Sequence, residues 1–583
     1  MRRNRSSWMV TFVATVAAAA TATRSFAQIP ESRIRELIKE AAERAAANQQ
    51  PVQPGQPAQA PGATRPTVRL TLDDAVKFAL DRNLDIAVQR LNPEISDIAI
   101  AAVKATYRPA VTSTLATQSQ TNPSTSVISG AGAGQGVSNG LTTFSGGLAQ
   151  NLPWGGGGFN LSLANTKNTT TNTTSLFNPS YSPTWVGQYT QPLLRGLRTD
   201  STRQQIVVTK INRDISDVQL RATITNTVSN VRNAYWDYVF AVQSVDVAQQ
   251  SLDLANRLVQ DNQTRVQVGT MAPIDVVQAQ SQAATAQQNL VQAQAARQTA
   301  ELALKRLIVG GTQDPNWTAS LDPIDRPDFV AESVDIEAAV RRALSERTDL
   351  DIAHKDLEIN DATLKFLRDQ TLPQTDFVAS YGLVGLGGTQ LITQGTGIAG
   401  QPRQITGTIP GGYSDALSSL FGAHFPRWTV SLNFSYPLGT STAEAAVARS
   451  RVQLNQIQAQ IKQLELQVAT DVTNAAIAVT NNAQAVQAAQ AAREFAQKQL
   501  EAEQSKFEVG MSTNYNVVLA QRDLANAQNT ELGNIRSYRK SLVELERLQQ
   551  TTLSSTGITM FSTGGLNTTA VGSGRPTVVV GGQ

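Results

Sequence analysis

The sequence contains an internal repeat, in which two long halves share motifs in the same order. Thirteen residues that begin at Val268 return from Val509, with the Gly, Val-Val and Ala-Gln positions in register at an offset of 241. A second pair of segments, 72–80 and 336–344, matches at an offset of 264, which also carries Pro109 onto Pro373. Two long copies of one unit predict a structural role before a catalytic one, because repeated units bury their apolar faces against each other.

One part of each half has the periodicity of very long helices. Apolar and small residues recur at steps of three, four or multiples of seven, from Val228 to Val259 and again from Leu454 to Leu500. Such a heptad-like seam is typical of helices that supercoil around each other. No proline interrupts 193–272 or 438–550. Each half is therefore predicted to hold a helix of about 65–70 residues, roughly 100 Å long.

The other part of each half predicts β-strands. Trp428–Tyr436 alternates apolar and polar residues, as the wall of a membrane barrel requires. Half of the 32 aromatic residues lie in 107–192 and 374–438, which suits aromatic girdles at a membrane interface. A soluble β-sandwich is the alternative, but the stretches 130–136 and 387–412 fit exposed extracellular loops better. The predicted strand runs are 109–120, 141–152, 159–167, 184–191, 375–383 and 428–436.

The order of these segments defines two repeats, each reading helix, strands, very long helix, tight turn and helix. The first covers 67–309, with strands at 109–192, a long helix at 196–268 and a second helix at 273–309. The second covers 334–550, with strands at 374–437, a long helix at 440–509 and a second helix at 513–550. A connector at 310–333 joins the repeats, and the Gly, Thr and Ser content of 551–583 predicts a flexible C-terminal tail.

The N-terminus predicts an exported protein. Three arginines within the first five residues precede an apolar stretch, and small residues lead to a cleavage position after Ala27. Residues 1–27 are therefore predicted to be a signal peptide. A membrane-anchoring helix is the alternative, but the apolar stretch is short for a span. Residues 28–66 predict a short helix followed by a Pro/Gln-rich linker.

A tight turn ends each of the two long helices and provides the candidate functional site. Gly269 and Gly510 stand where the helices must stop, because glycine accepts the left-handed conformation that closes a helix C-terminus. Pro273 suits the first turn of the next helix. The turn residues are Val268, Gly269, Thr270, Val509, Gly510 and Met511, with Asp275 and Asn516 at equivalent places just beyond them.

Composition and motifs argue against several classes of function. The chain has no cysteine, and its net charge of +3 comes from scattered lysines and arginines, so neither thiolate chemistry nor a nucleic-acid partner is predicted. His354 and His424 lie far apart without neighbouring ligands, so no metal and no cofactor is predicted. No catalytic motif emerges, so the chain is not predicted to be an enzyme. Tyr235-Trp236-Asp237-Tyr238 predicts packing between helices rather than a ligand site.

The ordered motifs resemble the TolC-like outer-membrane efflux protein family over roughly 70–550. The resemblance rests on Leu70–Leu80, Tyr107-Arg-Pro109, Gln191–Gly196, Tyr436-Pro-Leu-Gly439 and the two Val-Gly turns. It implies an α+β membrane protein with two structural repeats per protomer. Three protomers would form one outer-membrane β-barrel, surrounded by outer-membrane lipid and continued by a long periplasmic α-helical barrel.

The same resemblance implies a function and partners. The homotrimer would be a passive exit duct in the outer membrane, serving a tripartite efflux or secretion system. Its tip turns, Val268-Gly269-Thr270 and Val509-Gly510-Met511, would dock a periplasmic adaptor protein and face an inner-membrane transporter. An exported structural coiled-coil rod or adhesin without channel activity is the alternative, but it leaves the strands in both halves unexplained. A soluble periplasmic enzyme has only the export signal in its favour.

The chain departs from the family pattern in two places. Asp275 matches an acidic position of the archetype's tip, whereas Asn516 and Leu519 replace its acidic residues in the second hairpin. Asp275 and Asn516 are thus candidate pore-lining residues, but together they would not form the double acidic ring of the archetype. For Asp275 the alternative is a solvated acid near a helix start, where the helix dipole favours a negative charge. The first half also has four strand runs where the family pattern needs two. The extra runs, 141–152 and 159–167, would either widen the barrel or extend a surface hairpin.

Overall fold

The computed structural model describes residues 66–123, 136–326, 329–395, 404–439 and 441–555, which all belong to one compact unit, Pro66–Gln583. The predicted signal peptide, the short helix after it and nearly all of the Pro/Gln-rich linker lie outside the described residues, as does most of the C-terminal tail.

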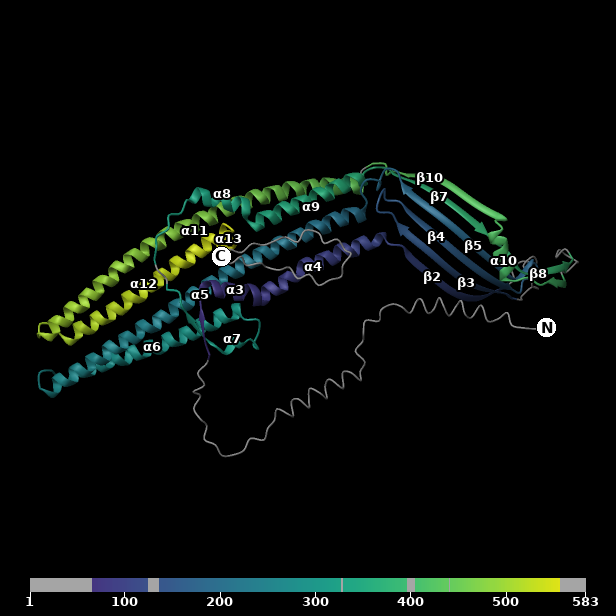
Figure 1. The fold of residues 1–583 in the computed structure, drawn as a ribbon. Helices are drawn as coiled ribbons and strands as arrows, with labels where there is room; N and C mark the ends of the chain where they lie inside the picture. Colours follow the sequence, from purple (N-terminus) through teal and green to yellow (C-terminus); the bar gives the residue numbers. More distant parts are fainter. Residues whose placement is uncertain (1–65, 124–135, 327–328, 396–403, 440, 556–583) are drawn as a thin grey trace, which may run out of the picture. The chain divides into compact units, whose positions relative to one another are not determined.

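Each half places two short helices before its strands and a hairpin of long helices after them (Figure 1). α5 and α11 each have 67 residues, and each continues through a tight turn into a shorter helix that lies beside it. In the first half the helices are α3 (Leu72–Arg82), α4 (Leu84–Lys104), α5 (Ser201–Gln267) and α6 (Pro273–Ile308). In the second they are α8 (Ile336–Glu346), α9 (Thr348–Gln370), α11 (Thr442–Glu508) and α12 (Asn514–Leu548).

Among the described helices, none is both long enough and apolar enough to cross a membrane.

The long helices begin a few residues later than the sequence predicted. Asp200 caps α5 by accepting a hydrogen bond from the backbone N of Arg203. The Arg203 guanidinium in turn donates to the three backbone carbonyls of residues 196–198, which holds this stretch in a turn instead of a helix. In the second half Ser441 and Glu444 form a capping box at the start of α11.

The short helices break at equivalent places, 264 residues apart. Asn83 separates α3 from α4, and its side-chain oxygen accepts hydrogen bonds from the backbone N of Asp85 and Ile86. Its amide nitrogen donates to the carbonyl of Leu307 on α6, so the break is tied to the neighbouring hairpin. Arg347 separates α8 from α9 without a side-chain cap.

The strands form an antiparallel sheet with a main path of six, in the order β10-β7-β5-β4-β3-β2. The extra runs of the first half, β3 and β4, lie inside this path between β2 and β5, so the alternative of a hairpin outside the sheet was wrong. The bounds are β2 (Ala110–Pro123), β3 (Gly136–Asn151), β4 (Gly158–Thr170), β5 (Phe177–Pro192), β7 (Gln374–Val384) and β10 (Phe425–Ser435).

The two faces of this sheet differ in polarity. Because side chains alternate along a strand, residues paired across neighbouring strands share one face. One such line across all six strands consists of Val111, Leu148, Leu161, Gly187, Tyr381 and Trp428. The next line, on the opposite face, consists of Thr112, Gly147, Ser162, Val186, Gly382 and Arg427. The sheet therefore has an apolar face and a largely polar face.

The expectation that 387–412 is a loop was wrong for the described part of this stretch, which is largely strand. This stretch contains β8 (Gly387–Gln394) and β9 (Gln404–Ile409), which pair with each other, and β8 also pairs with the start of β5. The helix α10 (Tyr413–Phe421) follows and packs against β8. A Cβ atom on Gly387 would lie 2.4 Å from the backbone N of Ala416. Glycine is therefore needed here for close packing, although its abundance suggested a loop.

Two short strands that the sequence did not reveal join the start of the first repeat to the connector. β1 (Thr67–Leu70) pairs in parallel with β6 (Ser320–Pro323), which follows the short helix α7 (Pro315–Thr318). Tyr235 and Tyr238 of α5 are fully buried and donate hydrogen bonds to the carbonyls of Leu70 and Leu321. Burial raises the pKa of Tyr238 to about 12, so its hydroxyl stays a donor at neutral pH. The packing role predicted for these tyrosines is confirmed.

The cap at the helix break gives a local test of stability. Replacing Asn83 by alanine removes two bonds to α4 and the bond to Leu307, so opening of the first turn of α4 should become easier by about 1–2 kcal/mol. Hydrogen exchange at the amides of Asp85 and Ile86 measures this change. Asn92→Ala is the matched control, because the Asn92 side chain bonds only Gln89 of its own helix. Equal exchange in the two variants would contradict the capping role.

Candidate functional site

Both tip turns have the same backbone geometry. The amide of Thr270 donates to the carbonyl of Arg265, and the amide of Gly269 donates to the carbonyl of Val266. The amides of Met511 and Gly510 repeat this pattern with Lys506 and Phe507. These paired bonds define a Schellman motif, which requires a left-handed residue after the helix. Gly269 and Gly510 meet this need with φ values of 80° and 78°.

The tips present apolar side chains to solvent. Val268, Val509 and Met511 of the predicted site are exposed, and Met511 is 78% exposed. Three further apolar residues that sequence reasoning missed are exposed on the first turns of the following helices: Ile274, Val277 and Tyr515. The sequence could have revealed them, because these three apolar residues fall outside the periodic apolar positions of α6 and α12. Clustered exposed apolar residues favour contact with another protein.

The two hairpins are joined just behind their tips. Leu258, Leu500, Phe507 and Val517 form part of a buried apolar cluster that contains residues of all four long-hairpin helices. The Arg265 guanidinium lies over the Phe507 ring at 4.5 Å and also donates to the Phe507 carbonyl. The first hairpin therefore contacts the second through apolar packing and a cation–π pair.

A polar link accompanies this apolar cluster. Asn262 of α5 and Asn514 of α12 are both buried, and the amide of Asn262 donates to the side-chain oxygen of Asn514 over 2.8 Å. Asn514 in turn donates to the backbone carbonyl of Asp275 on α6 over 3.2 Å. One buried asparagine thus bonds both helices of the opposite hairpin, a contact that the sequence did not predict. Hydrogen bonds between buried amides require a specific alignment, so they fix the axial position of one hairpin relative to the other.

The predicted pore-lining pair occupies unlike surroundings. The Asp275 side chain is half-buried, and the residue is tied to the second hairpin through its carbonyl. The Asn516 side chain is exposed and donates to the Ser512 hydroxyl, 3.3 Å away. Ser512 then donates to the Glu503 carboxylate over 2.6 Å. The structure therefore places the two residues on equivalent turns but in different hydrogen-bond networks.

The second tip carries an acidic group with a perturbed pKa. Glu503 accepts hydrogen bonds from Lys506 and Ser512, and these two bonds hold the pKa of its carboxyl below the ordinary value. Because the bonds favour the charged form, this network persists at neutral pH. It ties the end of α11 to the turn residue Ser512, an arrangement that the first tip does not have among the described contacts.

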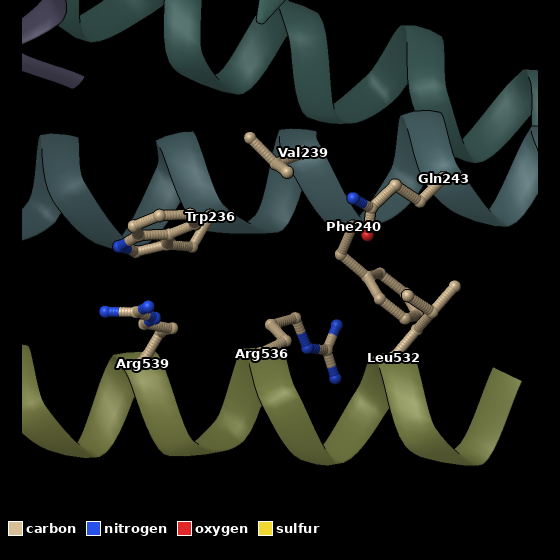
Figure 2. A pocket seen from close by; sticks show the side chains of 7 residues that line it. All are labelled: Trp236, Val239, Phe240, Gln243, Leu532, Arg536 and Arg539. Atoms are coloured by element: carbon tan, nitrogen blue, oxygen red, sulfur yellow. The ribbon is translucent and has the colours of Figure 1, made fainter. Parts of the chain in front are cut away.

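A pocket between α5 and α12 shows how the helices pack away from the tips (Figure 2). Arg539 lies over the Trp236 ring at 5.4 Å and Arg536 over the Phe240 ring at 4.6 Å. Asp237 also pairs with Lys540 at 2.9 Å. Aromatic rings of one helix thus meet cations of the other, which makes this region an interface between helices.

The described residues contain no group of three or more His, Asp or Glu side chains close enough to hold a metal ion. His354 lies on α9 with its Nδ1 2.8 Å from the carbonyl of Leu350 in the preceding turn.

The family model for outer membrane efflux proteins matches residues 158–310 and 339–549, more than half of the chain. The chain therefore belongs to the outer membrane efflux protein family, and it is an outer-membrane channel component of a tripartite efflux system. A comparison with curated protein sequences finds no match.

Solved structures share the fold at low sequence identity. The CmeC outer membrane channel of Campylobacter jejuni superposes with a TM-score of 0.57 and 14% identity, over 82% of this chain and 86% of that one. VceC of Vibrio cholerae gives 0.56 and 15%, over 82% and 95%. The open state of the MtrE channel of Neisseria gonorrhoeae gives 0.56 and 16%, over 83% and 89%.

The buried asparagine predicts a coupling between the tips. Asn514→Ala removes the bonds to Asn262 and to the Asp275 carbonyl and leaves buried polar groups unpaired, at a cost of about 1–3 kcal/mol. Amide exchange should therefore accelerate in both 258–275 and 507–520. The control is Asn516→Ala at an exposed position, which should change exchange only locally. Acceleration confined to the second hairpin would contradict the coupling.

The lowered pKa of Glu503 predicts a pH-dependent tip. A carboxyl with a lowered folded pKa stabilises the turn above its unfolded pKa, about 4.3, and loses this effect as the pH falls through the folded value. Glu503→Gln should therefore increase amide exchange of 506–516 at pH 7, and the difference from wild type should shrink as the pH falls below the unfolded pKa of about 4.3. Glu508→Gln, at an exposed position at the end of the same helix, is the control. An identical effect of both variants at pH 7 would exclude the network.

Proposed function

We propose that three copies of this chain form a passive export duct in which their sheets close into one outer-membrane β-barrel. The main support for this proposal is the difference in polarity between the two faces of the six-stranded sheet. Its apolar face suits contact with lipid, and its polar face suits a water-filled lumen. The helical hairpins continue the duct through the periplasm, as the family's architecture implies. The chain has no catalytic role in this proposal, because the transporter drives export.

The tip turns are proposed as the docking surface for a periplasmic adaptor and an inner-membrane transporter. Val268, Gly269 and Thr270 of the first tip and Val509, Gly510 and Met511 of the second form this surface. Support comes from their exposure and from the exposed apolar residues beside them. The long helices α5 and α11, which lead to these turns, also have the same length of 67 residues.

Asp275 and Asn516 are proposed to line the mouth of the duct. With an acid in one hairpin and an amide in the other, three copies would place three carboxylates at this ring. Such a mouth has a weaker negative potential than a ring with acids on both hairpins, so it should bind cations less strongly.

A structural rod or adhesin is the second candidate, but the sheet argues against it. A rod in water has no need for an apolar face that continues across six strands and leaves Val111 and Trp428 more than 70% exposed in the single chain. Purified protein inserted into planar lipid bilayers separates the two functions. If the protein is a duct, it should need detergent for purification and should give single-channel currents in the bilayer. Recovery of the protein as a soluble monomer without detergent would refute the duct.

The tip glycines give the functional test. Gly510→Val forces a β-branched residue to φ 78°, which should distort the turn by about 1–2 kcal/mol and weaken export several-fold while trimers still assemble. Export is measured as cell survival with a known cargo, and assembly by the mass of the purified protein. Gly533→Val, in the middle of α12 where a Cβ meets no atom within 4 Å, is the matched control. Full export by the Gly510 variant would exclude this turn as a docking surface.

A further inference from the structure

The sheet of the single chain ends in two open edges. β2 pairs only with β3, and β10 pairs only with β7, so each leaves a row of backbone donors and acceptors on its outer side in the described structure. All 14 residues of β2 are exposed, and none carries a charge. Long, uncharged edge strands readily pair with another chain. These edges therefore have the properties of an interface that is not yet filled.

The number of strands makes the two edges fit each other. Every pairing on the main path is antiparallel, and the path has six strands, an even number. β2 and β10 consequently run in opposite directions, so β10 of one copy can pair antiparallel with β2 of the next. The apolar residues at the edges, such as Val111 and Leu115 on β2 and Trp428 and Val430 on β10, lie on the same face of the sheet.

The two halves contribute unequally to this path. The second half supplies one entering strand, β7, and one leaving strand, β10, which pair directly. The first half supplies the equivalent strands β2 and β5, but the hairpin β3–β4 lies between them. The hairpin preserves the faces, because Val111 of β2 and Gly187 of β5 remain on one apolar line across it.

We propose that β2 of each chain pairs with β10 of a second copy, and that the ring so formed has six strands from each of three chains, 18 in all. The proposal rests on the proposed function for the number of copies. The occupant of the open edge is therefore another copy of this chain, and the hairpin β3–β4 determines the width of the duct at its outer end.

The added hairpin has a large geometric effect. With strands about 4.8 Å apart and tilted by about 40°, a ring of 18 strands has a backbone diameter of about 36 Å, against about 24 Å for 12 strands. The cross-section of the ring would thus be roughly twice that of one built from two strands per half.

Disulfide trapping tests the proposed edge pairing. The chain has no cysteine, so introduced pairs report without background. Each of Thr112→Cys, Thr114→Cys and Ala116→Cys on β2 is combined with each of Thr429→Cys, Ser431→Cys and Asn433→Cys on β10, which lie on the same face. At least one of the nine pairs should give covalent dimers and trimers upon oxidation. The control is Thr112→Cys with Val430→Cys on the opposite face. Absence of bonds in all nine pairs, or equal bonding in the control, would overturn the pairing.

Direct imaging tests the strand number. Purified wild-type protein in lipid nanodiscs, viewed along the ring axis by electron microscopy, should show 18 strands. Deletion of 136–170, which removes β3 and β4, should reduce the diameter to about two-thirds. A wild-type ring of any other strand number would overturn the proposal, whether or not the deletion variant folds. Wild-type channel currents and export, measured on the same preparation and strain, report separately on the proposed function: a conducting exporter without 18 strands refutes only this inference.

Discussion

The structure depends on covering the apolar seams of two 67-residue helices. A lone helix of this length, roughly 100 Å, would expose a continuous apolar stripe to water, which is strongly unfavourable. Each long helix folds back through a Schellman turn onto its own shorter partner, which covers one side of the stripe. The short helices α4 and α9 cover the part nearer the sheet, and the opposite hairpin covers the part near the tips.

Helices with similar seams can slide along each other, so polar contacts are needed to fix their positions. An apolar seam with a seven-residue period offers nearly equivalent packing after a shift of two turns. The buried pair Asn262–Asn514 near the tips and the hydroxyls of Tyr235 and Tyr238 in the middle of α5 lose their partners in any shifted arrangement. These contacts consequently prevent one tip from sliding along the other, although the hydrogen-bond networks at the two tips differ.

The sequence predicted the elements with strong periodicity and missed those that depend on distant contacts. The seam at Leu454–Leu500 and the alternation in Trp428–Tyr436 are local signals, and both lie in elements of the expected type. β1 and β6 were missed because four-residue strands have no measurable period and exist only through pairing across some 250 residues. The stretch 387–412 was misread because Gly387 is needed for contact with α10, which composition cannot reveal. The tip glycines were predictable from turn chemistry, whereas the buried role of Asn514 depends on the second hairpin.

The position of the hairpin β3–β4 has a consequence for how such proteins can diversify. Inserting one strand would reverse the direction of everything after it, and an odd shift in register would turn the apolar face inward. An added hairpin avoids both faults, and it leaves the ends of β2 and β5 attached to their own helices α4 and α5. In the proposed ring, added hairpins would therefore alter the width of the barrel in steps of two strands per subunit. The long helices and the proposed docking surface at their tips would stay unchanged.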